Sequence, residues 1–415
     1  MIRAVMEGHW TRWISARIFK VVDSLFPKDP ELAVFSGANG VRYGDNSRFL
    51  YEAFLREYPE ELKAVWVTRD GGLAERLGGE GRPAVYQHSV RGIFTLLRAK
   101  FVFCSFFDAD QFPGASFSRR TVTIQLWHGI PIKTIGGRMK NLDEGEASRR
   151  REIYQRTFTY WICSSGIERD RIASCTGIPP HRLPITGYPR NDYLISELHS
   201  SSSELLQRFP MLREKVILYA PTFREGRGVD FFPFDDFSKE ELDSFLEENG
   251  AYLLLREHHM DDLNGRGGVN AVRGKRIKAA NRDALEDLQE LLPHVDIMVS
   301  DYSGAWVDYL LLNRPIVFVP YDLETYERER GLLFDYWEVT PGPKVHSFGE
   351  FLSALQEYLG DPARDSDARL SVKKMFHRYE DGRAFSRIRQ LMREHLRSES
   401  GRGGRGLIDT EEGHS

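Results

Sequence analysis

Cysteine is scarce in this chain of 415 residues, and the three cysteines, Cys104, Cys163 and Cys175, form no C-x-x-C pair. Their spacing excludes a disulfide framework and the usual cysteine zinc site, which points to a reducing, cytoplasmic environment. No run of about 18 uninterrupted apolar residues occurs, so we expect no transmembrane helix. The charges nearly cancel, with 57 basic and 61 acidic residues, which argues against a nucleic-acid-binding protein acting through bulk charge.

Familiar catalytic motifs are also missing. The chain has no G-x-G-x-x-G, no G-x-x-x-x-G-K-[ST] and no G-x-S-x-G, which disfavours dinucleotide oxidoreductases, P-loop NTPases and α/β-hydrolases. Asp108-Ala-Asp110 matches the D-x-D pattern of metal-dependent sugar transferases, but we treat this three-residue match as chance and predict no metal site. Charged residues interrupt the apolar positions of segment 10–25, so we expect no signal peptide.

Short apolar runs alternate with helical patterns in two series, one ending with Leu183–Thr186 and the other spanning residues 216–319. This alternation predicts an α/β fold, with two Rossmann-like domains of parallel strands facing a cleft. We place the domains at residues 30–198 and 199–397, joined by a serine-rich linker. C-terminal helices at about 348–360 and 371–396 are expected to close the second domain, followed by a disordered tail over 398–415.

Residues 1–29 contain an amphipathic helical pattern in which Arg12, Arg17 and Lys20 lie between apolar positions. One interpretation is a helix docked on the body of the protein, and the other is an interfacial helix at a membrane surface. The basic stretch Asn264–Arg282 leaves a similar choice between a solvated surface and contact with anionic lipid or a polyphosphate-like polymer.

The segment Ile124–Lys133 places a His–Gly pair, His128 and Gly129, at the end of a predicted strand. A histidine there would face the cleft, where a pKa near neutrality suits a general base. Gly129 would let the backbone approach a ligand closely. The alternative is a structural histidine that is hydrogen-bonded within the turn.

Further candidate residues follow other apolar runs. Arg190 offers a forked donor suited to phosphate, although the adjacent Asn191 could belong to a turn that caps a helix. Backbone N–H groups at a helix start near Ser303 and Gly304 could bind phosphate, or the serine could be a plain N-cap.

His258 could be a second titrating group, or a surface or capping residue. Thr222, next to Pro221, could reach a nucleotide from a strand end, and Asp308 could hold a hydroxyl. Glu324 could pair with ribose or glycerol hydroxyls, or could cap a helix.

Taken in order, these motifs resemble a known family. The series comprises Gly44-Asp-Asn46, Gln125-x-Trp-His-Gly-x-Pro-x-Lys133, Gly187-x-Pro-Arg-Asn-Asp192, Tyr219-Ala-Pro-Thr-Phe223, Asp301-Tyr-Ser303, Arg314-Pro315, Tyr321-Asp-Leu-Glu324, Arg330-Gly331, Phe334-Asp-Tyr336 and Pro341-Gly-Pro343. It is similar to the CDP-glycerol glycerophosphotransferases that build or prime teichoic acids and related capsule polymers. The resemblance spans roughly Leu32 to Leu396.

The resemblance implies a GT-B fold with an N-terminal acceptor domain and a C-terminal donor domain. It also implies transfer of glycerol phosphate from CDP-glycerol, or of ribitol phosphate from CDP-ribitol, to a hydroxyl of a lipid-linked acceptor at the inner face of the cell membrane. CMP would leave, and no metal would be needed. On this basis His128 is the base, and Arg190, Thr222, Ser303, Gly304 and Asp308 hold the donor. His258 is the candidate second histidine.

Ser303-Gly304 stands where many family members have two serines, and His259 follows His258 where a proline is expected. Two other functions stay open at this level. One is a GT-B glycosyltransferase or epimerase that uses a sugar nucleotide, which donor screening would separate. The other is a catalytically silent protein that binds the membrane surface, whose role would survive loss of His128.

Overall fold

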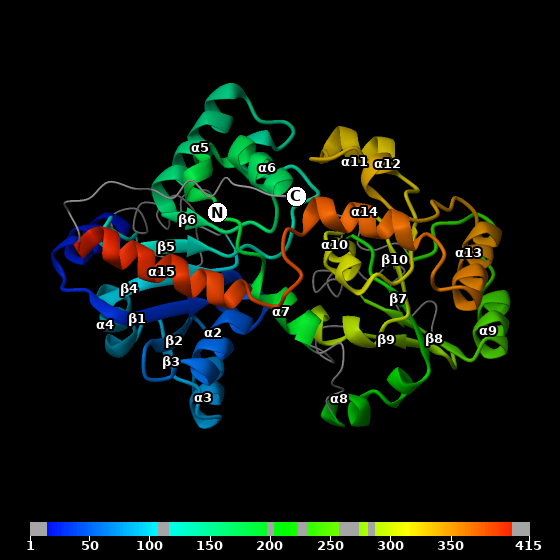
Figure 1. Ribbon diagram of the computed structural model, residues 1–415, viewed down its shortest axis with the longest axis horizontal. Helices are drawn as coiled ribbons and strands as arrows, with labels where there is room; N and C mark the ends of the chain where they lie inside the picture. Colours follow the sequence, from blue (N-terminus) through cyan, green and yellow to red (C-terminus); the bar gives the residue numbers. More distant parts are fainter. Residues whose placement is uncertain are drawn as a thin grey trace, which may run out of the picture.

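The computed structural model describes residues 15–106, 116–196, 203–222, 231–256, 274–280 and 287–400. Two lobes lie side by side, and each is built on one parallel sheet with helices packed against it (Figure 1). Helix α7, Pro189–Ser196, lies between the lobes. The predicted two-domain α/β architecture is confirmed. The domain boundary near residue 198 stays a prediction, because residues 197–202 lie outside the described ranges.

The first lobe holds a parallel sheet with strand order β3-β2-β1-β4-β5-β6. Its central strands are apolar and buried on both faces, as expected where helices cover a parallel sheet on both sides. The order reverses between β1 and β4, and ligands of such sheets bind at this switch point, beyond the carboxyl ends of the strands. The strands are β1 Asp29–Ser36, β2 Lys63–Thr68, β3 Ala84–Tyr86, β4 Ala99–Cys104, β5 Val122–Gln125 and β6 Tyr160–Trp161.

Helices connect these strands, and several begin at a side chain that caps them. Asp70, Ser89, Asp143 and Ser165 each accept a hydrogen bond from a backbone N–H of the first helical turn. The helices are α2 Asp45–Glu57, α3 Gly71–Gly79, α4 Val90–Arg98, α5 Glu144–Thr157 and α6 Gly166–Thr176. The expected strand at Leu183–Thr186 makes a single bridge, between Ile185 and Cys163, because Pro184 has no N–H to donate.

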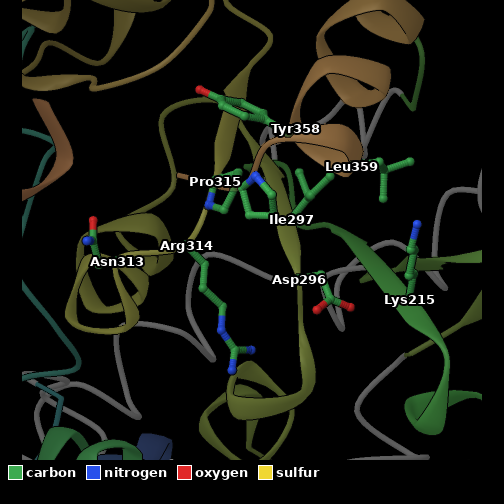
Figure 2. Close-up of a pocket in the computed structure, with 9 residues that line it drawn as sticks. Lys215, Asp296, Ile297, Asn313, Arg314, Pro315, Tyr358 and Leu359 are labelled. Carbon is green, nitrogen blue, oxygen red and sulfur yellow. The ribbon is translucent and has the colours of Figure 1, made fainter. Parts of the chain in front are cut away.

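The second lobe holds a parallel sheet with strand order β11-β10-β7-β8-β9. A hollow of about 180 Å³ lies at the amino-terminal ends of its strands, next to Lys215, Asp296 and Arg314 (Figure 2). Ligands of open α/β sheets bind at the opposite, carboxyl edge, so this hollow is not the expected donor site. The strands are β7 Lys215–Tyr219, β8 Ala251–Leu255, β9 Ile277–Ala279, β10 Ile297–Ser300 and β11 Ile316–Phe318.

The C-terminal helices divide between the lobes. As expected, α13 packs against β10 and β11 of the second sheet. The final helix, α15, instead lies across the first lobe (Figure 1), where Phe385 packs on Phe54 and Arg389 pairs with Glu61 at 2.5 Å. It also extends to Ser400, which corrects the predicted start of the tail at residue 398. The helices are α8 Ser203–Arg208, α9 Lys239–Glu248, α10 Ala305–Tyr309, α11 Leu323–Glu329, α12 Tyr336–Val339, α13 Phe348–Gly360, α14 Ser366–Phe376 and α15 Ala384–Ser400.

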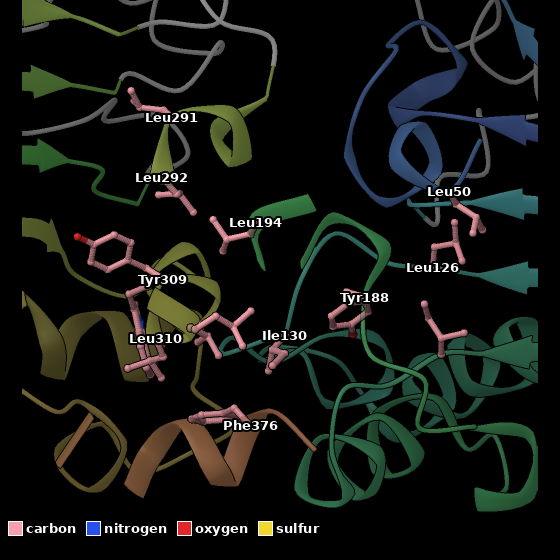
Figure 3. Packing of buried hydrophobic residues seen from close by; sticks show 14 of the residues in the cluster. Leu50, Leu126, Ile130, Tyr188, Leu194, Leu291, Leu292, Tyr309, Leu310 and Phe376 are labelled. Atoms are coloured by element: carbon pink, nitrogen blue, oxygen red, sulfur yellow. The ribbon is translucent and has the colours of Figure 1, made fainter. Parts of the chain in front are cut away.

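One hydrophobic cluster crosses from the first lobe into the second (Figure 3). Ile130 and Leu194 contribute to it from the first lobe and the inter-lobe helix, while Leu292 and Leu310 belong to the second lobe. Because burial of apolar surface contributes about 25 cal/mol per Å², this continuous core favours the docked arrangement of the two lobes.

The N-terminal segment is helical over residues 15–25 and docks on the first lobe. Its buried Asp23 pairs with Lys28 at 2.5 Å and accepts a hydrogen bond from the Ser118 N–H at 2.8 Å. These contacts hold the inner side of the helix on the first lobe. In the parts of the chain that the structure describes, no helix is long and apolar enough to span a bilayer.

Candidate active site

The turn that follows β5 has an unusual backbone that is fixed by side chains. Trp127 has φ +54° and Gly129 has φ +112°, so the residues on both sides of His128 lie in the left-handed half of conformational space. The Trp127 N–H donates to Gln125 Oε1 at 2.9 Å. Asn46, near the start of α2, donates from Nδ2 to the carbonyls of Leu126 at 3.1 Å and Trp127 at 2.9 Å. These bonds direct the turn toward the switch point of the first sheet.

His128 is half-buried between aromatic rings. Its ring stacks on Phe106, with centroids 4.1 Å apart, and contacts the tilted ring of Trp127, with centroids 4.2 Å apart. Nδ1 lies 3.1 Å from the Ser105 carbonyl oxygen. Since a carbonyl can only accept, Nδ1 carries the proton and Nε2 keeps a lone pair in the neutral ring.

The electrostatic surroundings keep this ring neutral. Burial lowers the pKa of His128 from 6.5 to about 4, and the charges of Arg190 and Lys133 act in the same direction. The hydrogen bond to Ser105 opposes the shift but is outweighed. At neutral pH, Nε2 can therefore accept a proton from a hydroxyl without first losing one.

Arg190, from α7, lies directly beneath this turn. Nη1 donates to the His128 carbonyl at 2.7 Å and to Asp45 Oδ1 at 3.0 Å, while Nη2 donates to Asp308 Oδ2. The Arg190 backbone N–H also donates to Asn46 Oδ1 at 3.1 Å. Its guanidinium fork therefore binds two carboxylates and a carbonyl, a geometry different from the phosphate site expected from the sequence.

Asp308 comes from α10 of the second lobe, so its pair with Arg190 joins the lobes. Only 1% of Asp308 and 8% of Arg190 is exposed. Gln289 Nε2 donates to the same Asp308 oxygen at 2.9 Å. A Cβ on Gly129 would lie 2.0 Å from Arg190 Nη2, so the turn leaves room for the guanidinium only because residue 129 is glycine.

The second lobe contributes the opposite edge of the site, at the carboxyl ends of β7 and β10. Asp301 Oδ1 accepts from the Thr222 N–H at 2.8 Å and from the Tyr302 N–H at 2.6 Å, which ties the two strand exits together. A Cβ on Gly304 would lie 3.0 Å from the Ile130 carbonyl of the first lobe. The segment Ser303–Gly304 and the loop after His128 therefore face each other across the lobe boundary.

A short backbone ladder closes one side of this boundary. Lys133 forms an antiparallel bridge with Leu332. Thr134 N–H donates to the Gly331 carbonyl at 3.1 Å, and Leu333 N–H donates to the Ile132 carbonyl at 2.8 Å. Arg48 of α2 also crosses the boundary, pairing with Asp287 at 3.2 Å and Glu290 at 2.7 Å.

The other predicted site residues have different surroundings. Pro221 is half-buried beside Thr222 at the end of β7, and Glu324 is exposed on α11. Asn191 is buried, and neither of its side-chain polar atoms has a hydrogen-bond partner in the structure. His258 lies outside the described residues, as do residues 264–273 of the basic stretch. Within the ranges that the structure covers, no cluster of three or more His, Cys, Asp or Glu residues could hold a metal ion.

Several residues that build the site were not predicted from the sequence. Asn46 and Asp45 belong to the Gly-Asp-Asn motif quoted above, which assigned them no role. Asp301 likewise appeared in a motif without a function. Gln289 and Asp287 had no local signal, because their contacts reach residues distant in the sequence.

Two lobes, each built on one parallel sheet, meet where Gly304 approaches the loop after His128, and this arrangement is a GT-B-like architecture. The chain belongs to the CDP-Glycerol:Poly(glycerophosphate) glycerophosphotransferase family, whose model matches residues 18–394. The predicted family is thus confirmed.

Two curated relatives show the range of lengths in this family. The chain is 28% identical over 366 residues to the teichoic acid poly(glycerol phosphate) polymerase of Bacillus subtilis (strain 168), covering 84% of this chain but 47% of that one. It is 28% identical over 389 residues to the teichoic acid glycerol-phosphate transferase of Staphylococcus aureus (strain NCTC 8325 / PS 47), covering 90% of this chain and 95% of that one. It thus spans about half of the first relative and nearly all of the second.

Solved structures support the fold. The wall teichoic acid polymerase TagF superposes with a TM-score of 0.72 at 21% identity, covering 96% of each chain. The UDP-GlcNAc 2-epimerase of Neisseria meningitidis superposes with a TM-score of 0.53 at 14% identity, covering 88% of this chain and 99% of that one. At these identities the likeness concerns the fold alone.

Proposed function

We propose that the protein transfers glycerol phosphate from CDP-glycerol to a hydroxyl of a lipid-linked acceptor and releases CMP. CDP-ribitol is the alternative donor, because ribitol-phosphate polymerases of Staphylococcus aureus are also similar to this chain. The supporting observation is His128, whose Nδ1 lies against the Ser105 carbonyl, so that Nε2 keeps the lone pair of the neutral ring. The loop that follows His128 meets Gly304 of the second lobe through the Ile130 carbonyl.

The reaction can be written from these parts. The acceptor oxygen attacks the phosphorus that carries the alditol, and its proton passes to Nε2 of His128. The bond from that phosphorus to the bridging oxygen breaks, and CMP leaves with the electron pair. We propose that backbone N–H groups near Ser303 and Gly304 stabilise the phosphoryl oxygens, and that no metal ion takes part.

The first test measures CMP release from CDP-glycerol and CDP-ribitol with lipid-linked acceptors, with and without EDTA. We expect acceptor-dependent release that survives EDTA and is lost in His128→Ala. Release from a sugar nucleotide instead would favour a glycosyltransferase of the same fold. Loss of activity with EDTA would reject the metal-free mechanism.

We further propose that the enzyme works from the cytoplasmic side, bound to the inner face of the membrane. The outward side of helix 15–25 exposes Ile18, Val21 and Leu25, at 60%, 61% and 76%. Phe26 packs on Phe94 of α4, whose own outer side exposes further apolar residues, Val90, Ile93 and Phe94.

Basic residues flank this apolar surface and suit an anionic bilayer. Arg17 and Lys20 are exposed on the N-terminal helix, and Arg91 and Arg98 are exposed on α4. Apolar side chains beside cationic ones are the pattern of an interfacial membrane contact. A lipid-linked acceptor also requires the enzyme to work at a bilayer surface.

Vesicle flotation tests this attachment with Val21→Asp, using Met375→Asp on α14 as the matched control, since Met375 is also exposed. The wild type and the control should float with phosphatidylglycerol-containing vesicles and float less with pure phosphatidylcholine. Val21→Asp should remain in the soluble fraction. Equal flotation of all three proteins would reject the surface.

A further inference from the structure

The catalytic turn depends on two side chains that lie outside it. Three consecutive carbonyls, those of residues 126 to 128, are bound by Asn46 and Arg190. These two residues are joined by the hydrogen bond from the Arg190 N–H to Asn46 Oδ1. Because the backbone is left-handed on both sides of His128, the turn needs such support to keep its shape.

The same arginine also reaches the second lobe. Its Nη2 donates to Asp308, whose oxygen is shared with Gln289. A buried ion pair is weak evidence for stability, because desolvation offsets much of the attraction between the charges. Arg190 binds the His128 carbonyl with one nitrogen and a second-lobe carboxylate with the other. A movement of the second lobe would therefore displace the guanidinium and, with it, the turn that carries His128.

We propose that Arg190 is a positioning residue that couples docking of the second lobe to the orientation of His128. Asn46 is its partner within the first lobe. This role differs from the direct binding of donor phosphate that the sequence led us to expect, and it rests on the proposed function only for its kinetic test.

The kinetic test compares Arg190→Lys and Asp308→Asn with Arg156→Lys, which changes an exposed arginine of α5. Lysine keeps the charge but cannot bind the His128 carbonyl and Asp308 in the same fork geometry. We expect kcat to fall at least tenfold in both site variants, with KM for CDP-glycerol changing less than threefold. A tenfold rise in KM with kcat preserved would identify a donor ligand and overturn the proposal, as would unchanged kinetics.

A second measurement does not depend on activity. The Cε1 resonance of His128 is assigned in protein labelled with ¹³C-histidine by its disappearance in His128→Ala. We expect that resonance to move or broaden in Arg190→Lys and Asp308→Asn and to stay unchanged in Arg156→Lys. An unmoved resonance in both site variants would refute the positioning role, whereas absence of CMP release from the wild type would refute only the proposed function.

Folding is checked by circular dichroism and thermal unfolding. If Arg190→Lys does not fold, Asn46→Ser provides the same test within the first lobe, because it removes the bonds to two carbonyls and keeps the Arg190–Asp308 pair. We expect the same loss of kcat and the same change in the His128 resonance. A folded Asn46→Ser protein with normal kcat and an unmoved resonance would contradict the proposal.

Discussion

Gly129→Ala is the substitution for which the structure gives the clearest magnitude. An added Cβ would lie 2.0 Å from Nη2 and 2.9 Å from Cζ of Arg190. The end of an arginine side chain can usually move aside at little cost. Here it is held by Asp308, Asp45 and the His128 carbonyl, so it can move only by losing these partners.

Two contributions determine the size of the effect. Holding a residue with a Cβ at φ +112° costs on the order of 1–3 kcal/mol. Breaking a buried ion pair so that one charge loses its partner costs about 3–5 kcal/mol. Even the lower ends of these ranges together give a loss of about 4 kcal/mol in the free energy of unfolding, a large part of the total for a typical domain.

The assay is urea unfolding, with CMP release measured on the same preparations. Gly78→Ala is the matched control, because its Cβ would meet nothing within 4 Å and α3 has an ordinary backbone there. The control should gain about 0.5–1 kcal/mol. Gly129→Ala in an Asp308→Asn background should lose less than it does alone, since the pair is already weakened. A Gly129→Ala protein as stable and active as the control would refute the assigned contact.

Three other predictions follow from named groups. His128 has a pKa of about 4 and must be neutral to act, so kcat/KM should fall only below about pH 5; an acid limb near pH 6.5 would contradict this. Lys133→Met removes one of the two charges that lower this pKa, the other being that of Arg190, and should move the acid limb to higher pH in the same rate profile. Burial raises the pKa of Glu168 from 4.5 to about 7, so the folded state binds the extra proton and wild-type stability should fall as pH rises from 4.5 to 7. Glu168→Gln should lack this decline. The change in the free energy of unfolding with pH, measured in urea, should therefore differ between the two proteins by about 3 kcal/mol at pH 8. Parallel stability–pH curves for the two proteins would disprove it.

Much of the fold could be predicted because parallel strands in these sheets are short and uninterrupted in their apolar character. Most strands of both sheets follow from such runs, but two short edge strands, β3 and β9, were not predicted. The errors occurred where local character was outweighed by distant contacts. The α15 segment looks like a continuation of the second domain, yet Asp192 caps it by accepting from the N–H groups of Ala384 and Phe385, which draws it to the first lobe.

The residues that build the site could be predicted only in part. His128 was singled out because it ends an apolar strand, which in a parallel sheet brings a side chain to the carboxyl edge where ligands bind. Asn46 and Gln289 were missed, because each contributes to the site through hydrogen bonds that local sequence does not reveal. No periodicity or local motif spacing encodes such pairs.

Arg190 shows why chemistry alone does not decide a role. A guanidinium fork fits a carboxylate as well as it fits a phosphate, so an arginine after a strand predicts either partner equally. Burial and the identity of the acceptor distinguish them, and here the acceptors are Asp45, Asp308 and a backbone carbonyl. Because the fork is occupied, the proposed mechanism assigns stabilisation of phosphoryl charge to the backbone N–H groups near Ser303 and not to Arg190. In our proposal Arg190 contributes to catalysis through the geometry of the base. The imidazole is kept neutral mainly by burial, and the charge of Arg190 acts in the same direction.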